Sequence, residues 1–234
     1  MATKTAVSKI LQISKDCLFP IFCLGCDKEG EWVCADCFGK IDLRGVFYCP
    51  VCYRPNGNGA CCAVCQPQSC LDRAVAIAVY QEENLVGKLI KALKYNYAEE
   101  IIAVFAKMID GFLIHQLGVL SEIDLIVPVP LHRRRFAERG FNQARLLADI
   151  LGQKIGRPVV DLLKRDRYTL QQAKLSREER QLNVHHAFVN SDFRANAVLL
   201  VDDVFTTGAT MQECARVLKS SGVKRVIGFS VARG

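Results

Sequence analysis

The sequence contains no apolar run near the roughly 20 residues that a bilayer-spanning helix needs. It also lacks a basic leader that continues into an uninterrupted apolar core and a small-residue cleavage site. We therefore expect no transmembrane segment and a cytoplasmic protein whose thiols are kept reduced. Two phosphate-binding motifs are missing as well, GxxxxGK(S/T) and GxGxxG. Their absence argues against a P-loop protein and against a dinucleotide-binding fold.

Cysteine is almost absent from the last two thirds of the chain. Eleven of the twelve cysteines lie between Cys17 and Cys70, and only Cys214 lies beyond them. In a chain of 234 residues this distribution predicts two units, a cysteine-rich module over residues 1–72 and a larger domain over residues 73–234. The first unit holds seven basic and seven acidic side chains, and the second holds 24 and 17. The larger domain thus carries the whole net charge of +7, which suits anionic partners such as phosphates or nucleic acid.

The cysteines of the first unit occur as CxxC pairs. In "CLGCDKEGEWVCADC" two pairs stand seven residues apart, which lets four thiolates converge on one zinc ion. A second set combines "CPVC" with "CCAVC", where Cys61 can replace Cys62. The alternatives fit less well, because a redox CxxC needs a single pair in a βαβ setting and disulfides need an oxidising compartment. The predicted ligands are Cys23, Cys26, Cys34 and Cys37 for one ion, and Cys49, Cys52, Cys62 and Cys65 for the other.

These zinc ions are expected to be structural. No histidine or carboxylate is arranged beside the cysteines to leave an open coordination position, so the metal would fold the module and would not catalyse. Zinc ribbons contact nucleic acid, other proteins or only their own domain, and the spacing does not distinguish these roles.

Beyond residue 73, short apolar runs alternate with longer amphipathic stretches. "AVAIAVY", "DLIVPVP", "AVLLV" and "RVIGFSVA" are typical of buried strands. The predicted helices cover residues 83–94, 98–117, 141–155 and 211–221. Strands that alternate with helices predict an α/β fold with a mostly parallel sheet.

Two carboxylates stand side by side at the end of one strand, in "LLVDDVFTTGAT". Open parallel sheets bind ligands beyond the carboxyl ends of their strands, often at a helix N-terminus that favours anions. The carboxylates can accept hydrogen bonds from vicinal ribose hydroxyls, and the small residues after them suit a phosphate monoester. The alternative is a capped helix start with two solvated aspartates. The predicted sugar-phosphate site comprises Asp202, Asp203, Thr206, Thr207, Gly208, Ala209 and Thr210.

The same motif resembles the signature of type I phosphoribosyltransferases. That resemblance implies a mostly parallel sheet with helices on both faces, which binds 5-phosphoribosyl 1-diphosphate (PRPP) together with magnesium. Asp202 and Asp203 would meet the ribose hydroxyls, and residues 206–210 the 5-phosphate. Further matches are similar to the ComF family of competence proteins, which combines such a domain with an N-terminal zinc ribbon. They are the paired CxxC, "LIKALKY", "VPVPLHRRRFAERGFNQARLLA" and "TLQQAKLSREERQLNVHHAF".

Two basic segments would serve the diphosphate. "PLHRRRFAERG" is predicted to be a loop with four arginines against one glutamate, enough charge for a diphosphate or a nucleic acid backbone. By the phosphoribosyltransferase resemblance its contacts come from Leu131, His132 and Arg133, where His132 is either a general acid or merely solvated. "QQAKLSREERQLN" resembles the flexible loop that closes over the diphosphate and excludes water, although a solvated helix fits its charge pattern equally well. Its candidate residues are Gln172, Lys174, Arg177 and Arg180.

The ComF resemblance implies natural transformation, in which such proteins act in the cytosol on incoming single-stranded DNA. A single strand needs a basic track interleaved with aromatic side chains, although phenylalanines more often pack in a core. The candidate DNA contacts are Lys91, Lys94, Tyr95, Arg134, Arg135 and Arg139.

The sequence thus predicts a competence protein that handles single-stranded DNA and binds PRPP and magnesium. An active phosphoribosyltransferase with an unidentified acceptor is the alternative. A third reading is an adaptor whose zinc module docks a helicase or another DNA-uptake protein. Whether the domain catalyses a reaction stays open at this point.

Overall fold

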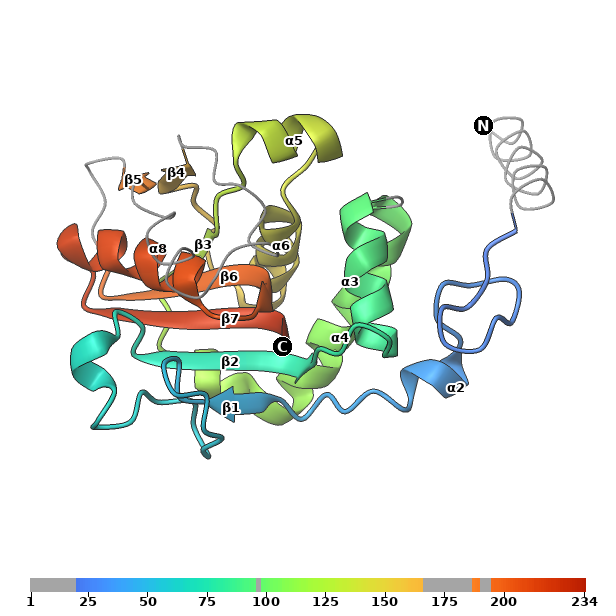
Figure 1. Cartoon of the computed structure of the whole chain (residues 1–234), viewed down its shortest axis with the longest axis horizontal. Helices are drawn as coiled ribbons and strands as arrows, with labels where there is room; N and C mark the ends of the chain where they lie inside the picture. Colours follow the sequence, from blue (N-terminus) through green and yellow to red (C-terminus); the bar gives the residue numbers. More distant parts are fainter. Residues whose placement is uncertain (1–19, 96–97, 166–186, 190–194) are drawn as a thin grey trace.

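The computed structural model describes residues 20–95, 98–165, 187–189 and 195–234. A five-stranded sheet in the order β1-β2-β7-β6-β3 forms its centre (Figure 1). The strands β2 (Arg73–Val79), β7 (Arg225–Arg233), β6 (Ala197–Phe205) and β3 (Leu125–Pro128) run parallel to one another. The short strand β1 (Val46–Tyr48) pairs antiparallel with β2 at the edge. The predicted mostly parallel α/β sheet is confirmed.

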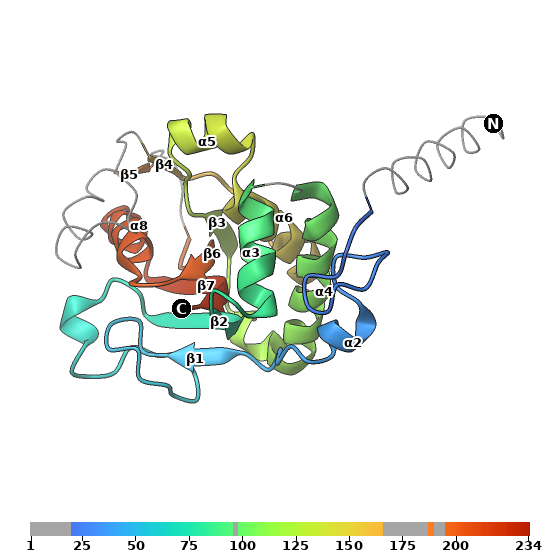
Figure 2. The ribbon, with the colours of Figure 1, turned by 45° about the vertical axis from the view of Figure 1, so that its right-hand side comes forward.

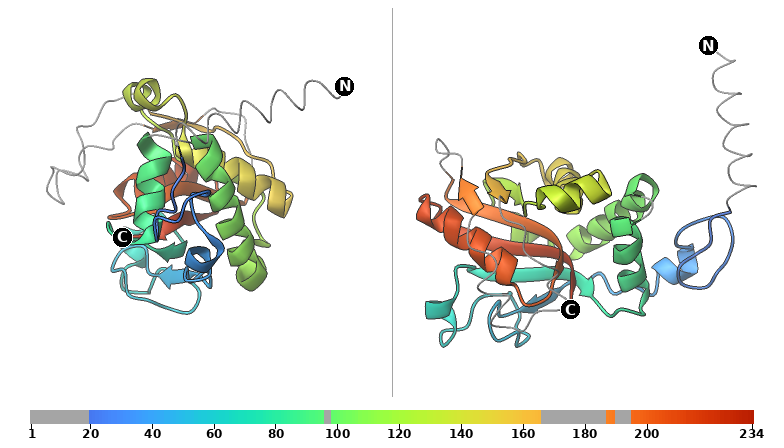
Figure 3. Two further views of the ribbon diagram at one scale, coloured as in Figure 1. Left: turned by 90° about the vertical axis from the view of Figure 1, so that its right-hand side faces the viewer. Right: turned by 45° about the horizontal axis from the view of Figure 1, so that its top comes forward.

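Helices cover both faces of this sheet, as predicted (Figure 3). On one face, α3 (Leu85–Tyr95), α4 (Ala98–Gln116) and α6 (Gln143–Ile155) share a core with residues of β2, β6 and β7. On the other face, α8 (Ala209–Ser220) packs against the remaining residues of the same strands. Because both faces are covered, the central strands are apolar along most of their length.

The remaining described elements are short. The cysteine-rich segment contributes α2 (Ala35–Phe38) and the 3-10 helix η1 (Gln66–Gln68), and a second 3-10 helix, η2 (Leu117–Leu120), follows α4. A two-stranded hairpin of β4 (Leu163–Arg165) and β5 (Ala187–Val189) lies beside α8. The basic helix α5 (Arg133–Arg139) follows β3. Among the described residues, no helix combines the length and apolar character that a membrane crossing requires.

The cysteine-rich segment is joined to the body by a strand. Its β1 adds to the edge of the main sheet, with Val46 opposite Ala76 and Tyr48 opposite Ala74. Tyr48 is buried and its ring meets that of Phe205 edge to face at 5.2 Å. These contacts cross residue 72, where the sequence places a boundary between two units, and that boundary stays a prediction.

Candidate functional site

A cavity of about 390 Å³ opens at the carboxyl ends of β3 and β6. In Figure 2, α5 lies above these strand ends and α3 lies beside them. The wall combines the end of α3, the segment after β3, the first residues of α6, and the turn between β6 and α8. Its charged members are Lys94, Arg135, Arg139, Arg165, Asp202 and Asp203. Acidic and basic side chains from distant parts of the chain therefore converge on one space.

The two adjacent aspartates have different partners. Asp203 is almost buried and forms an ion pair with Lys94, whose Nζ lies 2.8 Å from Oδ2 of Asp203. Burial, and then the charge of Asp203, raise the pKa of Asp202 to about 8. The backbone N–H of Asp203 donates to Oδ1 of Asp202 at 2.9 Å. Near neutral pH the pair thus favours a single negative charge, which Lys94 balances. Lys94 thus contacts the carboxylates within this cavity, and its predicted contact with DNA stays a prediction.

The turn from β6 into α8 is shaped by Gly208. This residue is the N-cap of α8 with a left-handed φ of 67°, and no side chain of the described residues caps the helix. Its missing Cβ matters, because a carbon there would lie 2.3 Å from the ring of Phe205. Thr206 and Thr210 line the cavity. Thr207, Gly208 and Ala209 complete the same turn without lining it. An uncapped helix start beside two hydroxyl residues can accept an anion.

The basic segment after β3 is a short helix and not the predicted loop. His132 begins α5, with Nδ1 accepting a hydrogen bond from the N–H of Arg134 at 3.1 Å, and Gly140 ends it in a left-handed conformation. Arginine favours helices and Gly favours their ends, so local preferences support this outcome. Burial, and then the surrounding arginines, lower the pKa of His132, which keeps it neutral at neutral pH.

The helical form of this segment divides the residues predicted to contact the diphosphate, Leu131, His132 and Arg133, and those predicted to contact DNA, Arg134, Arg135 and Arg139. Leu131 lines the cavity beside the aspartates, and so do Arg135 and Arg139. Arg133 instead lines a neighbouring cavity of about 470 Å³. His132 lines neither of these two cavities. Arg134 points into solvent and pairs with Glu138 at 3.3 Å.

Other predicted residues lie elsewhere. Lys91 is on the exposed face of α3, 3.2 Å from Glu82. Tyr95 is 69% exposed at the end of the same helix. The predicted flexible loop, with Gln172, Lys174, Arg177 and Arg180, lies outside the described residues.

Three polar residues of the cavity were not identified from the sequence. Arg165 closes β4, and burial lowers the pKa of its guanidinium, followed by the charge of Arg135. Asn142 and Gln143 begin α6 and line the cavity from the opposite side. Asn142 and Gln143 lie within a longer stretch that resembles the ComF family, which does not single them out, and the strand pair that carries Arg165 has no local motif. Folding alone brings these residues to the aspartates.

The cysteines form two groups of four. Within each group, the four sulfurs all lie within 4.8 Å of one another. The first group comprises Cys23, Cys26, Cys34 and Cys37, and the second comprises Cys49, Cys52, Cys62 and Cys65. The sulfurs of Cys26 and Cys34 are 3.6 Å apart, and the sulfur of Cys62 lies 3.7 Å from that of Cys49 and 3.9 Å from that of Cys52. Four sulfurs bound tetrahedrally to zinc at about 2.3 Å would be about 3.8 Å from one another, so these distances are close to those of a zinc site. Cys61 lies 3.9 Å from Cys49 but outside the second group. Both groups can therefore hold zinc, the second one through Cys62.

Backbone groups prepare the first site for a cation. Burial opposes ionisation of the Cys23 thiol, but the N–H groups of Cys34 and Gly25 donate to its sulfur at 3.3 Å and 3.4 Å. The net effect lowers the pKa of Cys23 to about 6. A thiolate is the form that binds zinc, so this geometry fits the metal.

The second cysteine group lies against the turn before α8. Tyr53 follows its Cys52, and the hydroxyl of Tyr53 donates to the carbonyl of Thr207 at 3.0 Å. Arg233 lies over the rings of Tyr53 and Tyr48, 4.7 Å and 5.2 Å from their centroids. The cysteine-rich segment thus supports the turn that borders the cavity.

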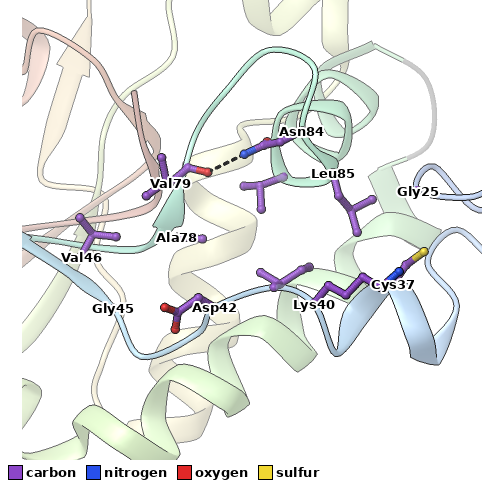
Figure 4. A pocket seen from close by; sticks show the side chains of 12 residues that line it. Gly25, Cys37, Lys40, Asp42, Gly45, Val46, Ala78, Val79, Asn84 and Leu85 are labelled. Atoms are coloured by element: carbon purple, nitrogen blue, oxygen red, sulfur yellow. Dashed lines mark hydrogen bonds between the residues drawn. The ribbon is translucent and has the colours of Figure 1, made fainter.

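A further cavity of about 350 Å³ lies at the other end of α3 (Figure 4). Cys37 of the first cysteine group and the nearby Gly25 border it, and the end of β2 borders it through Val79. The side-chain amide of Asn84, just before α3, donates a hydrogen bond to the carbonyl of Val79 at the end of β2, at 3.0 Å. Half of its lining residues have aliphatic side chains, and it contains none of the predicted PRPP contacts.

Comparison with known proteins agrees with this geometry. The model of the Phosphoribosyl transferase domain matches residues 137–233, which include α6, β6, α8 and β7. The fold and the match together define a protein with a phosphoribosyl transferase domain.

Relatives cover nearly the whole chain. "Competence protein ComFC" of Bacillus subtilis (strain 168) is 30% identical over 88% of this chain and 86% of its own. "DNA utilization protein YhgH" of Salmonella typhi is 32% identical over 86% of this chain and 90% of its own. "Competence protein F" of Haemophilus influenzae is 29% identical over 86% and 96%. The chain belongs to the ComF family of competence proteins, and the resemblance inferred from its motifs is confirmed.

Proposed function

We propose that this protein acts in natural transformation, where it handles incoming single-stranded DNA in the cytoplasm and binds PRPP with magnesium. The relatives named as competence and DNA utilization proteins support the competence role. The proposal includes the division into a zinc-ribbon module over residues 1–72 and a phosphoribosyltransferase-like domain over residues 73–234. It also includes one structural zinc ion in each group of four cysteines.

One observation carries the PRPP proposal. The cavity joins two carboxylates, an uncapped helix start and several arginines within about 390 Å³, a volume in the range of small-molecule sites. Asp202 and Asp203 would accept hydrogen bonds from the ribose hydroxyls. The turn over residues 206–210 would bind the 5-phosphate. Magnesium would enter on the diphosphate, because this ion is held largely by substrate phosphates and water.

The basic surface around α5 supports the DNA proposal. Arg134 points into solvent, and Phe136, on another side of the same helix, is 50% exposed and lines the neighbouring cavity. Lys91 lies on the exposed face of α3. A base can stack on an exposed aromatic ring while its phosphate pairs with a nearby cation. Arg135 and Lys94 face the cavity and would contribute less to a DNA track than the sequence suggests.

PRPP binding is tested with the double substitution Asp202→Ala and Asp203→Ala. We expect PRPP binding with magnesium, measured by calorimetry, to be abolished while circular dichroism shows an intact fold. Asp110→Ala is the matched control, because Asp110 is an exposed carboxylate on α4 that lines neither this cavity nor the neighbouring one. Unchanged affinity in the double variant would contradict the site assignment.

DNA binding is tested by titrating labelled single- and double-stranded oligonucleotides at two salt concentrations, with and without PRPP and magnesium. Phosphate contacts should appear as a steep salt dependence. Arg134→Ala and Lys91→Ala should each weaken single-strand binding, whereas Lys224→Ala should not, because Lys224 is exposed at the amino end of β7. No binding at low salt would remove the nucleic-acid role.

Catalysis is a second candidate function, and one observation favours it. The cavity lined by Arg133 shares Leu131, Asn142 and Arg165 with the cavity of the aspartates, so an acceptor has room next to the proposed ribose. A nitrogen nucleophile would attack the ribose carbon that loses diphosphate. Release of diphosphate from PRPP in the presence of candidate acceptors measures this activity. If none is released, PRPP serves as a ligand only.

A further inference from the structure

Arg139 is held in a fixed position at the mouth of the PRPP cavity. It is the last residue of α5, and it lines the cavity together with the two aspartates. Its guanidinium lies 5.6 Å from the ring centroid of Tyr95, which ends α3. On another side, its Nη1 donates to Oε1 of Gln143 at 3.1 Å. An arginine braced by two neighbouring helices has lost much of its freedom before any ligand arrives.

Gln143 is itself incompletely satisfied. Its side chain is only 3% exposed. Because a guanidinium can only donate, the atom that faces Arg139 must be the amide oxygen, which fixes the direction of the amide group. The Nε2 atom of Gln143 is buried and has no hydrogen-bond partner among the residues that the structure describes. Burying an unpaired donor costs about 1 to 3 kcal/mol, so an acceptor is expected at this side of the cavity.

The start of α6 holds Gln143 rigidly. Asn142 is its N-cap, with a side-chain oxygen that accepts from the N–H of Ala144 at 3.1 Å. The amide nitrogen of Asn142 donates to the carbonyl of Val129, just after β3, at 3.0 Å. Because Asn142 already satisfies the N–H of Ala144, this helix start offers fewer free N–H groups than the start of α8, and side chains become the main donors for an anion here.

The cavity therefore has two different anion-binding ends. One is the turn before α8, where helix N–H groups and threonines suit a single phosphate. The other is the junction of α5 and α6, where Arg139 and Gln143 offer a charged fork and an amide donor. Lys94 adds little to either end, because it is paired with Asp203.

We propose that Arg139 binds the diphosphate of PRPP, with Gln143 as the residue that positions it, and that this pair makes the cavity select a diphosphate over a monophosphate. The inference rests on the proposed PRPP function. It takes Arg139 and Tyr95 out of the predicted DNA track and places them in the ligand site. It also assigns the diphosphate to the end of α5, away from His132 and Arg133 at its beginning.

The test compares the binding of PRPP with magnesium, inorganic diphosphate and ribose 5-phosphate by calorimetry. Arg139→Ala should weaken PRPP and diphosphate at least tenfold, since a hydrogen bond to a charged group is lost. Its affinity for ribose 5-phosphate should stay within about twofold, because that ligand has only the phosphate for the opposite end. Gln143→Leu should show the same selective loss with a smaller size, about three- to tenfold.

Arg157→Ala is the matched control, because Arg157 is an exposed arginine just after α6 that lines neither of the two cavities. It should leave all three affinities unchanged. Equal loss of ribose 5-phosphate and PRPP in Arg139→Ala would overturn the inference, and so would wild-type PRPP affinity combined with weaker single-strand binding. If the wild-type protein binds neither PRPP nor diphosphate, the proposed function fails and the inference fails with it. If wild type binds PRPP and both variants bind it equally well, only the inference fails.

Discussion

Replacing Gly208 by alanine tests whether the turn into α8 requires a residue without a side chain. Two penalties apply to this substitution. The left-handed φ of 67° disfavours any residue with a Cβ by about 1 to 2 kcal/mol. The new carbon would also lie 2.3 Å from the ring of Phe205, which cannot be accommodated without movement. Phe205 is only 1% exposed and packs on the ring of Tyr48, so it has little room to move.

Gly156→Ala separates the two penalties. Gly156 ends α6 with a φ of 65°, almost the same as that of Gly208, but within the described part of the chain no heavy atom beyond its own neighbours lies within 4 Å of an added Cβ. Gly156→Ala should therefore lower the free energy of unfolding only by the cost of the left-handed backbone, about 1 to 2 kcal/mol. Overpacking a core typically costs a further 1 to 3 kcal/mol or so, which is our expected difference between the two variants.

Urea denaturation with zinc present measures both free energies of unfolding. The expected difference corresponds to a gap of roughly 2 to 12 °C between the two melting temperatures, at about 2 to 4 °C for each kcal/mol in a chain of this size. Equal destabilisation of both variants would refute the reasoning, because it would mean that Phe205 does not restrain the turn. If Gly208→Ala weakens PRPP binding and Gly156→Ala does not, the shape of the turn also contributes to ligand binding.

Three further outcomes are expected. Cys34→Ser should remove one of the two zinc ions from the purified protein, as measured by metal analysis, whereas Cys214→Ser should remove none. Because burial and the neighbouring carboxylate raise the pKa of Asp202 to about 8, the native state binds the extra proton and stability should fall as pH rises from about 4 to about 8. Asp202→Asn should flatten this decline in denaturation curves taken across that range, and a parallel decline in both proteins would exclude Asp202 as its source. Tyr53→Phe removes the donor to the Thr207 carbonyl and should weaken PRPP binding about two- to tenfold without loss of zinc. Unchanged affinity would show that the cysteine-rich segment does not support the turn.

The sequence by itself determined the features that depend on near neighbours in the chain. CxxC pairs bring their sulfurs together over a few residues, so the two groups of four follow from spacing. The helix bounds agree with the apolar periodicity to within about two residues, because each long helix buries one face. The turn after β6 is encoded the same way, since a strand, small residues and a glycine follow one another directly. The three-residue strands were missed, because so short a run has no readable periodicity.

Only the tertiary structure decided what surrounds the aspartates. Lys94 pairs with Asp203 although more than 100 residues separate them in the chain. Tyr53 meets Thr207 across 154 residues, and Gln143 and Arg165 enter the cavity from a helix and a hairpin with no motif of their own. Periodicity and spacing describe one element at a time, whereas these contacts depend on how the helices pack across the sheet. The division of the arginines between cavity and solvent is likewise decided by α5, whose direction is fixed by its caps and by its packing on Tyr95 and Gln143.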